Sequence, residues 1–302
     1  MTNLPRQVTI VEVGPRDGLQ NEAALVPTPL KIAFVDKLTT AGFPAIEVSA
    51  FVSPKWVPQM GDASEVFAGI TRRDGVRYGA LVPNRAGLDR ALAAGVRDIA
   101  IFAAASETFS RKNINQSIDA SFAAYRDVTD AAMQGGLRVR AYLSTSFGCP
   151  FEGDVDPRRV AELTERLLQL GAYEVAVSDT IGIAHPGQVS RLLDLLLARV
   201  DTARVALHFH DTRGTALANV LAALHHGITT FDSSAGGLGG CPYAPGAAGN
   251  LATEDLLFML HGLNIDTGVS LESVVQASRA IEGVIGHPLP SRYVRALPSP
   301  LA

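Results

Sequence analysis

The chain alternates short apolar segments with helix-patterned segments eight times, and this repeat limits the folds open to it. Apolar residues between the strand-like segments recur at helical spacing, and most helical segments end in glycine, as helix C-termini prefer. Strands joined in this way by crossover helices pair in parallel. We predict strands at residues 8–14, 45–51, 77–83, 98–106, 138–147, 174–180, 205–211 and 230–236. The helical segments include Leu30–Gly42, Arg85–Gly95, Ser117–Gly135, Pro157–Gly171, Pro186–Val200 and Thr215–Gly227.

Eight parallel strands can close into a (β/α)8 TIM barrel or lie open as a doubly wound sheet. The number and even spacing of the strands favour closure. No Gly-x-Gly-x-x-Gly motif opens the first helix, as a dinucleotide-binding sheet would require. We therefore predict an α/β fold with one catalytic TIM-barrel domain over residues 1–302. The barrel spans about residues 8–262, and a short helical C-terminal extension spans about 270–302.

Composition excludes several function classes. Charged residues make up 19% of the 302 residues, the net charge is −4, and there is no basic cluster for nucleic acid or a membrane surface. The N-terminus lacks a signal-peptide pattern, and no window reaches ~18 uninterrupted apolar residues. Two cysteines, Cys149 and Cys241, are too few for a disulfide framework. We expect a cytoplasmic protein with reduced thiols that acts on a small molecule.

His208 and His210 lie near the end of the seventh predicted strand. Residues two apart in a strand point to the same face, so the two imidazoles lie side by side. This arrangement is half of a metal site. Two histidines at a strand end can equally be polar residues that meet solvent, so a third ligand has to decide.

The loop after the first strand carries Arg16 and Asp17. Active sites of TIM barrels lie at the C-terminal ends of the strands, so this pair can offer a metal a carboxylate beside a guanidinium. A solvent-exposed loop salt bridge is the alternative. Glu47 lies between Ile46 and Val48 in the second strand, and because buried carboxylates need partners, Arg16 is its expected partner.

Two further strand ends carry candidate side chains. Asp179 ends the sixth strand, where it can serve the site or instead cap the following helix. The eighth strand leads into the glycine-rich segment 235–250, which we interpret as a flexible lid with Cys241 and Asn250 as its chief reactive and ligating side chains. The segment lacks the lysine-serine ending of a phosphate-binding loop, so no nucleotide cofactor is expected.

Asp17, His208, His210 and Asn250 together form a mixed set of oxygen and nitrogen ligands from three strand ends. A carboxylate, an amide oxygen and two neutral imidazoles suit Mg²⁺ or Mn²⁺, with positions left open for substrate oxygens. Zn²⁺ remains an alternative.

Three segments resemble the 3-hydroxy-3-methylglutaryl-CoA lyases, TIM-barrel metallolyases: residues 11–22 (VEVGPRDGLQNE), 208–210 and 233–250 (SSAGGLGGCPYAPGAAGN). The resemblance runs from about residue 8 to at least residue 250. It implies cleavage of 3-hydroxy-3-methylglutaryl-CoA to acetyl-CoA and acetoacetate. Position by position, it implies Asp17, His208, His210 and Asn250 as metal ligands, Arg16 as catalytic cation, Cys241 as loop thiol, and Glu47 and Asp179 as acids. A homodimer or higher homo-oligomer is expected by analogy.

This retro-Claisen chemistry suits the residue types. A divalent cation lowers the pKa of the substrate hydroxyl, and Arg16 stabilises charge on the thioester oxygen. Asp179 is our first choice of base, with a metal-bound water or His208 second, and Cys241 protonates the enolate. The residues expected to contact substrate are Arg16, Gln20, Asn113 in the loop after the fourth strand, Ser144 and Thr180.

Three alternatives remain. The substrate can be a longer 3-hydroxy-3-alkylglutaryl-CoA or citramalyl-CoA, because the motifs do not define the alkyl pocket. A Claisen-condensing synthase shares Arg-Asp and His-x-His but usually has Asp-Thr-Thr-Leu before the Arg-Asp pair, where this chain has Glu12-Val13-Gly14-Pro15. A non-catalytic barrel that only binds metal or CoA esters is the third, and metal-dependent turnover would exclude it.

Overall fold

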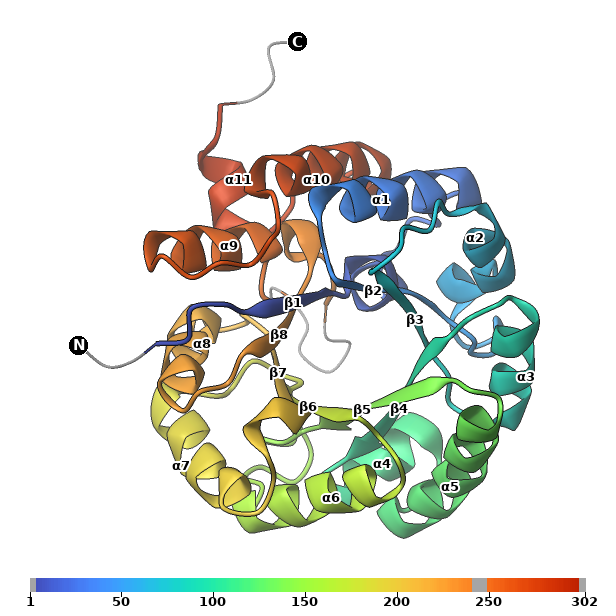
Figure 1. Cartoon of the computed structure of the whole chain (residues 1–302), viewed down its shortest axis with the longest axis vertical. Helices are drawn as coiled ribbons and strands as arrows, with labels where there is room; N and C mark the ends of the chain where they lie inside the picture. Colours follow the sequence, from blue (N-terminus) through green and yellow to red (C-terminus); the bar gives the residue numbers. More distant parts are fainter. Residues whose placement is uncertain (1–3, 241–248, 299–302) are drawn as a thin grey trace.

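The computed structural model describes residues 4–240 and 249–298, and its eight strands form one closed parallel barrel (Figure 1). Each strand pairs with the next in sequence, and β8 returns to β1 with Thr230 opposite Thr9. The predicted TIM barrel is confirmed. Its strands are β1 (Thr9–Glu12), β2 (Ala45–Ala50), β3 (Arg77–Leu81), β4 (Asp98–Ala104), β5 (Arg138–Ser144), β6 (Glu174–Asp179), β7 (Val205–Phe209) and β8 (Thr230–Ser233).

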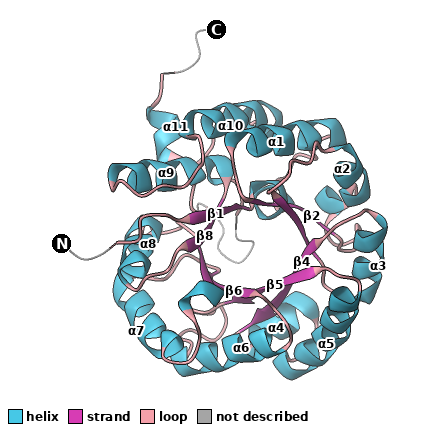
Figure 2. Cartoon of the chain, in the orientation of Figure 1, coloured by secondary structure: helices cyan, strands magenta, loops and turns pink. Residues whose placement is uncertain are grey.

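A ring of helices surrounds the barrel (Figure 2). All six helical segments named from the sequence are helical. The ring comprises α1 (Thr28–Ala41), α2 (Ala63–Gly69), α3 (Arg85–Ala93), α4 (Glu107–Ile114), α5 (Ile118–Gln134), α6 (Pro157–Gln169), α7 (Pro186–Leu197) and α8 (Ala216–His225).

The segment that holds Asn113 was expected to be a loop, and this prediction is wrong. It is helix α4, which begins after Ser106, whose hydroxyl accepts from the backbone N–H of Phe109 at 3.3 Å. The helix ends at Asn115, which adopts a left-handed φ of 54°. Two local devices, an N-cap and a left-handed C-cap, therefore define a helix too short to show apolar periodicity.

The predicted strands extend too far at their C-terminal ends. The fifth strand was expected to reach residue 147 but ends at Ser144, because Thr145 has a φ of 58° and cannot continue a strand. Ser144 is therefore the last residue of β5, and Thr145 and Ser146 lie in the loop that follows it.

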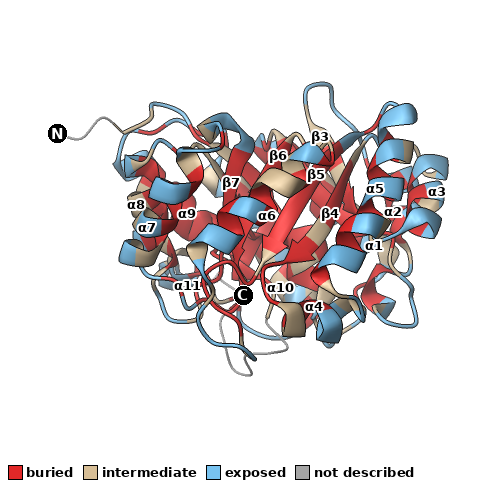
Figure 3. Ribbon diagram, turned by 90° about the horizontal axis from the view of Figure 1, so that it is seen from below, coloured by how far each residue is buried: buried red, intermediate tan, exposed pale blue. Residues whose placement is uncertain are grey.

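The core lies between the strands and the helices that cover them (Figure 3). Every residue of β6 is buried, as expected for a parallel strand covered on both faces. Helix α6 buries Val160, Leu163 and Leu167, which share one face at helical spacing. Asp156 caps this helix by accepting from the backbone N–H of Arg158 at 2.9 Å.

The predicted C-terminal extension contains α10 (Leu271–Ile285) and α11 (Arg292–Ala296), and α10 lies alongside α1 (Figure 1). Helix α9 (Thr253–Gly262) comes before the extension, within the span predicted for the barrel. The residue after α1 lies close to the segment before α10: Gly42 has a φ of 98°, and a Cβ added to it would lie 2.6 Å from the carbonyl oxygen of Gly268. Within residues 4–240 and 249–298, no helix is long and apolar enough to cross a membrane.

Candidate active site

A cavity of about 690 Å³ opens at the C-terminal ends of the strands. This is the end at which TIM barrels carry their active sites. The lining includes eight residues that the sequence analysis named as site residues: Arg16, Asp17, Gln20, Asn113, Ser144, Thr180, His208 and His210. Side chains from the ends of β1, β5, β6 and β7 and from helix α4 therefore meet in one space.

His208 and His210 lie next to one another at the end of β7. Their ring centroids are 5.2 Å apart, and both side chains are buried. The two-residue spacing thus places both imidazoles on the cavity side, as the strand period predicts.

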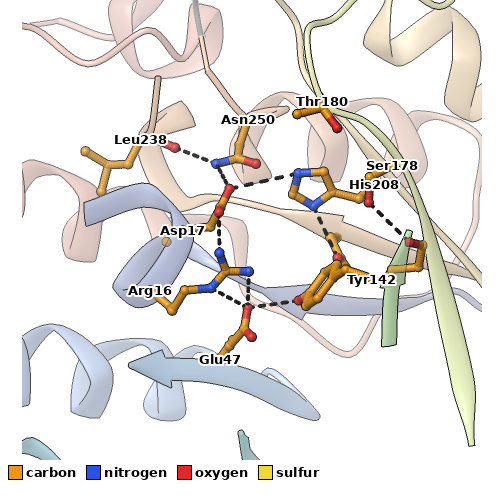
Figure 4. Close-up of polar contacts among 12 residues, drawn as sticks. Arg16, Asp17, Glu47, Tyr142, Ser178, Thr180, His208, Leu238 and Asn250 are labelled. Atoms are coloured by element: carbon orange, nitrogen blue, oxygen red, sulfur yellow. Dashed lines mark hydrogen bonds and ion pairs between the residues drawn. The ribbon is translucent and has the colours of Figure 1, made fainter. Parts of the chain in front are cut away.

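Asp17 lies in a single π-helical turn, Gly14–Gly18, that follows β1. Its Oδ2 is 3.9 Å from Nε2 of His208, and one ligand atom each from Asp17, His208 and His210 lies within 4.8 Å of the others. Asn250 joins this group: its Nδ2 donates to Oδ2 of Asp17 at 2.9 Å. The four residues predicted as metal ligands therefore lie together. Figure 4 shows three of them, Asp17, His208 and Asn250.

The chemistry of this donor set fits a divalent cation. Oδ1 of Asn250 and Nδ1 of His210 are buried without a hydrogen-bond partner among the described residues. Burial, reinforced by His208, lowers the pKa of His210 to about 4, so its imidazole is neutral near pH 7. The nearby Arg16 and histidines hold the pKa of Asp17 well below its ordinary value despite burial. Neutral imidazoles and an ionised carboxylate are the protonation states that metal binding requires.

Arg16 is held from two sides beside Asp17. It forms an ion pair with Asp17, and its Nε donates to Oε2 of Glu47 at 2.8 Å. The hydroxyl of Tyr142 donates to the same Glu47 oxygen at 2.9 Å, and the guanidinium carbon of Arg16 lies 5.3 Å from the Tyr142 ring centroid. Glu47 is thus buried and paired with Arg16, the partner expected from the sequence.

A second buried arginine lies beneath this layer. Arg140, on β5, donates from Nη2 to Oδ1 of Asp232 at 2.7 Å and from Nε to Oε1 of Glu174 at 2.7 Å. Its Nη1 also donates to the hydroxyl of Tyr142 at 3.0 Å. The sequence analysis missed Arg140, Tyr142 and Asp232. The available signal was a charged residue next to apolar neighbours inside a predicted strand, Arg140 between Val139 and Ala141 and Asp232 after Phe231.

Asp179 does not line the cavity. Its two carboxylate oxygens accept from the backbone N–H groups of Ile183 and Ala184, each at 3.0 Å, so it shapes the turn after β6. Its neighbours Ser178 and Thr180 do line the cavity, and strand alternation turns Asp179 to the other side. Burial raises its pKa to about 6.

Cys241 lies outside the described residues. Cys149, the other cysteine, is buried, and its Sγ is 2.9 Å from the hydroxyl of Ser106.

A match to the protein family described as HMGL-like covers residues 7–281. The chain belongs to the HMGL-like family. A relative from Pseudomonas aeruginosa, named 3-hydroxy-3-isohexenylglutaryl-CoA/hydroxy-methylglutaryl-CoA lyase, is 53% identical over 295 residues, which cover 98% of each chain.

Solved structures agree with this HMGL-like assignment. A hydroxymethylglutaryl-CoA lyase from Pseudomonas aeruginosa superimposes with a TM-score of 0.96 at 52% identity, covering 97% of this chain and 98% of that one. An HMG-CoA lyase from Acinetobacter baumannii in complex with coenzyme A and 3-methylmalate gives a TM-score of 0.93 at 40% identity, covering 99% of this chain and all of the other.

Proposed function

We propose that this HMGL-like chain is a divalent-metal-dependent lyase that cleaves 3-hydroxy-3-methylglutaryl-CoA to acetyl-CoA and acetoacetate. The observation that carries the proposal is the meeting of Asp17, His208 and His210 within 4.8 Å, beside a buried guanidinium, in a cavity of about 690 Å³. The names of relatives that are about half identical over nearly the whole chain support it.

Asp17, His208, His210 and Asn250 would hold Mg²⁺ or Mn²⁺. When bound, the cation supplies a Lewis acid that lowers the pKa of the substrate hydroxyl and orients the acyl group. Oδ1 of Asn250 has no partner among the described residues and is therefore available to a cation, whereas its Nδ2 is engaged by Asp17 and Leu238.

The reaction removes the proton of the tertiary hydroxyl, breaks the carbon–carbon bond and places the electron pair in the thioester enolate. The oxygen of the hydroxyl becomes the ketone of acetoacetate. We assign Arg16 to the thioester oxygen, where its positive charge stabilises the enolate. Glu47 and Tyr142 hold Arg16 in place, which lowers the reorganisation that the guanidinium needs during the reaction. Cys241 donates the proton that converts the enolate into acetyl-CoA.

Asp179 and a cavity water compete as the base that removes the hydroxyl proton. His208 is not assigned this role, because Asp232 engages its Nδ1 and we assign its Nε2, which faces Asp17, to the metal. Asp179 has a pKa near 6, suited to a base, but must release two backbone hydrogen bonds before it reaches substrate. A cavity water is the alternative. Asp179→Asn separates them: loss of kcat by more than about 10²-fold assigns Asp179, and retained kcat assigns the water.

Four further residues line the cavity and are assigned to the substrate, whose acyl part and CoA arm both have to fit: Gln20, Asn113, Ser144 and Thr180. Three predictions from the sequence are retained. The chain forms a single catalytic domain, is located in the cytoplasm and assembles into a homo-oligomer.

A longer 3-alkyl substituent is the second candidate. The residues that line the cavity include the apolar and aromatic side chains Leu81, Phe102, Phe109, Ile114 and Tyr125. The name of the relative from Pseudomonas aeruginosa includes a substrate with an isohexenyl group in place of the methyl group. Comparison of kcat/KM for the methyl and isohexenyl thioesters decides which one the cavity prefers.

The test is acetoacetate release from 3-hydroxy-3-methylglutaryl-CoA by reduced, metal-stripped protein with and without Mg²⁺ or Mn²⁺. Metal-dependent release supports the proposal. No release from folded protein with either metal rejects this substrate, and the isohexenyl and citramalyl thioesters are then assayed under the same conditions.

A further inference from the structure

Asp232 is a buried carboxylate directly behind the metal-site histidine. It lies on β8 opposite His208 of β7 in the strand register, and its side chain is fully buried. Its Oδ2 is 3.2 Å from Nδ1 of His208. It is absent from the cavity lining, so it acts on the site through the groups that it binds, the imidazole of His208 and the guanidinium of Arg140.

Arg140 determines the charge of Asp232. The guanidinium reaches across the barrel from β5 and binds both carboxylate oxygens, Oδ1 at 2.7 Å and Oδ2 at 3.2 Å. Both oxygens thus accept charge-assisted hydrogen bonds from one guanidinium, which is the pairing of an ionised carboxylate. The carboxylate is therefore ionised and can only accept hydrogen bonds.

An acceptor-only Asp232 determines which nitrogen of His208 carries the proton. Nδ1 must donate, so the neutral imidazole has its bare lone pair on Nε2, which faces Asp17 across 3.9 Å. A histidine that binds metal through one nitrogen commonly has its other N–H held by such a carboxylate.

We propose that Asp232 and Arg140 are positioning residues that hold His208 in the tautomer and orientation needed to bind the metal through Nε2. This inference rests on the metal site put forward above. It also explains why Arg140, Asp232 and Glu174 are buried beneath the cavity, although the burial of charged groups costs free energy.

The same guanidinium also supports the opposite half of the site. Its Nη1 donates to the hydroxyl of Tyr142. This hydroxyl donates to Glu47, the partner of Arg16, as Figure 4 shows. A change at Arg140 would therefore disturb both halves and leave buried carboxylates without a partner. Asp232 is the better place to test the inference.

The test compares Asp232→Asn with Glu174→Gln. Both variants convert a carboxylate partner of Arg140 into an amide, but Glu174 makes no contact with His208. Asparagine can donate to Nδ1, which would move the proton of His208 to Nε2. We expect Asp232→Asn to bind Mn²⁺ about 10- to 100-fold more weakly, as for other residues that support a ligand, and Glu174→Gln to stay within about threefold of the parent. Titration is followed by calorimetry and by the spin-resonance signal of free Mn²⁺.

A second readout needs neither metal nor substrate. In metal-free protein labelled with ¹⁵N-histidine, the His208 ring should carry its proton on Nδ1, and the proton should shift toward Nε2 in Asp232→Asn. Unchanged Mn²⁺ affinity in Asp232→Asn, an equal loss in Glu174→Gln, or a proton on Nε2 of the parent protein would each overturn the inference. The tautomer is measured in the parent protein, so a variant that does not fold leaves the test intact. Failure of the lyase assay alone would reject the substrate and not this inference.

Discussion

His210 lies opposite Asn250 in an isolated antiparallel bridge that joins the end of β7 to the segment before α9. Two backbone hydrogen bonds flank the pair, from Asp211 to Gly249 and from Leu251 to Phe209, each of 2.9 Å. Asn250 is therefore held beside the histidines by main-chain contacts, and its amide oxygen is left without a partner among the described residues. This bridge completes a candidate metal site from residues distant in sequence.

Removal of one imidazole from this site should abolish tight metal binding. We expect His210→Ala to weaken Mn²⁺ affinity by more than about 100-fold, because it removes a ligand and not merely its support. His225→Ala is the matched control, since His225 is an exposed histidine of α8. Calorimetric titration of both metal-stripped proteins gives the comparison. Similar affinities in the two variants would remove His210 from the site.

Arg16 should not be replaceable by lysine. The guanidinium contacts Asp17 and Glu47 together, and an ammonium group cannot reproduce that fork. We expect Arg16→Lys to lower kcat by about 10²–10³-fold, with Mn²⁺ affinity changed by less than about tenfold. Arg85→Lys, in an exposed pair with Asp89, should keep its rate. If Arg16→Lys lowers Mn²⁺ affinity and kcat to the same degree, Arg16 supports the metal site and does not stabilise charge on the thioester oxygen.

The two cysteines should behave differently. Cys241→Ala should lower kcat by about 10²–10⁴-fold because the enolate loses its proton donor. Its Mn²⁺ affinity should be unchanged. Cys149→Ala should retain kcat to within about threefold, because Cys149 is buried against Ser106 and does not line the cavity. Steady-state assays of both variants in reducing buffer test this, and normal turnover by Cys241→Ala would assign the protonation to another group.

Glu254 should make stability fall as the pH rises. Burial raises its pKa from 4.5 to about 7, so the folded chain holds this proton more tightly than the unfolded chain does. The stabilisation is complete below pH 4.5 and is lost as the pH rises through about 7. The full loss is on the order of 3 kcal/mol. Glu254→Gln, which resembles the protonated form, should show a shallower decrease in urea-unfolding free energy between about pH 5 and pH 8.

The exposed Glu272 of α10 provides the matched control for this pH effect. Glu272→Gln should leave the slope of stability against pH as it is in the parent. A Glu254→Gln variant with the slope of the parent would show that Glu254 is not the group that releases the proton.

Gly236 should tolerate alanine less well than Gly136. Both have positive φ, 70° and 72°, so each alanine variant carries about 1–2 kcal/mol of backbone strain. A Cβ at Gly236 would also lie 2.7 Å from the side chain of Leu289, whereas one at Gly136 would meet nothing within 4 Å. Gly236→Ala should therefore cost at least about 1 kcal/mol more, measured by urea unfolding. Equal losses would mean that Leu289 moves aside freely.

Local sequence patterns were sufficient to predict the fold and several residues of the candidate metal site. Alternating strand and helix signals predicted the closed barrel, because each short segment carries its own periodicity and its own ending residue. The strand period likewise placed His208 and His210 on one face, and position at strand ends predicted that Asp17 would join them. These inferences concern neighbours in sequence or a rule common to all TIM barrels.

Closure of the barrel decided which side chains face the cavity and which buried charges pair with one another. β6 is buried on both faces, so its sequence has no polar side to show that Ser178 faces the cavity and Asp179 faces away. The pair between Arg140 and Asp232 joins residues 92 positions apart, and no local pattern encodes such a contact. The sequence by itself determined which side chains stand at the strand ends. Only the tertiary structure decided which of them point inward and which buried charges support them, because both depend on strands that meet across the barrel.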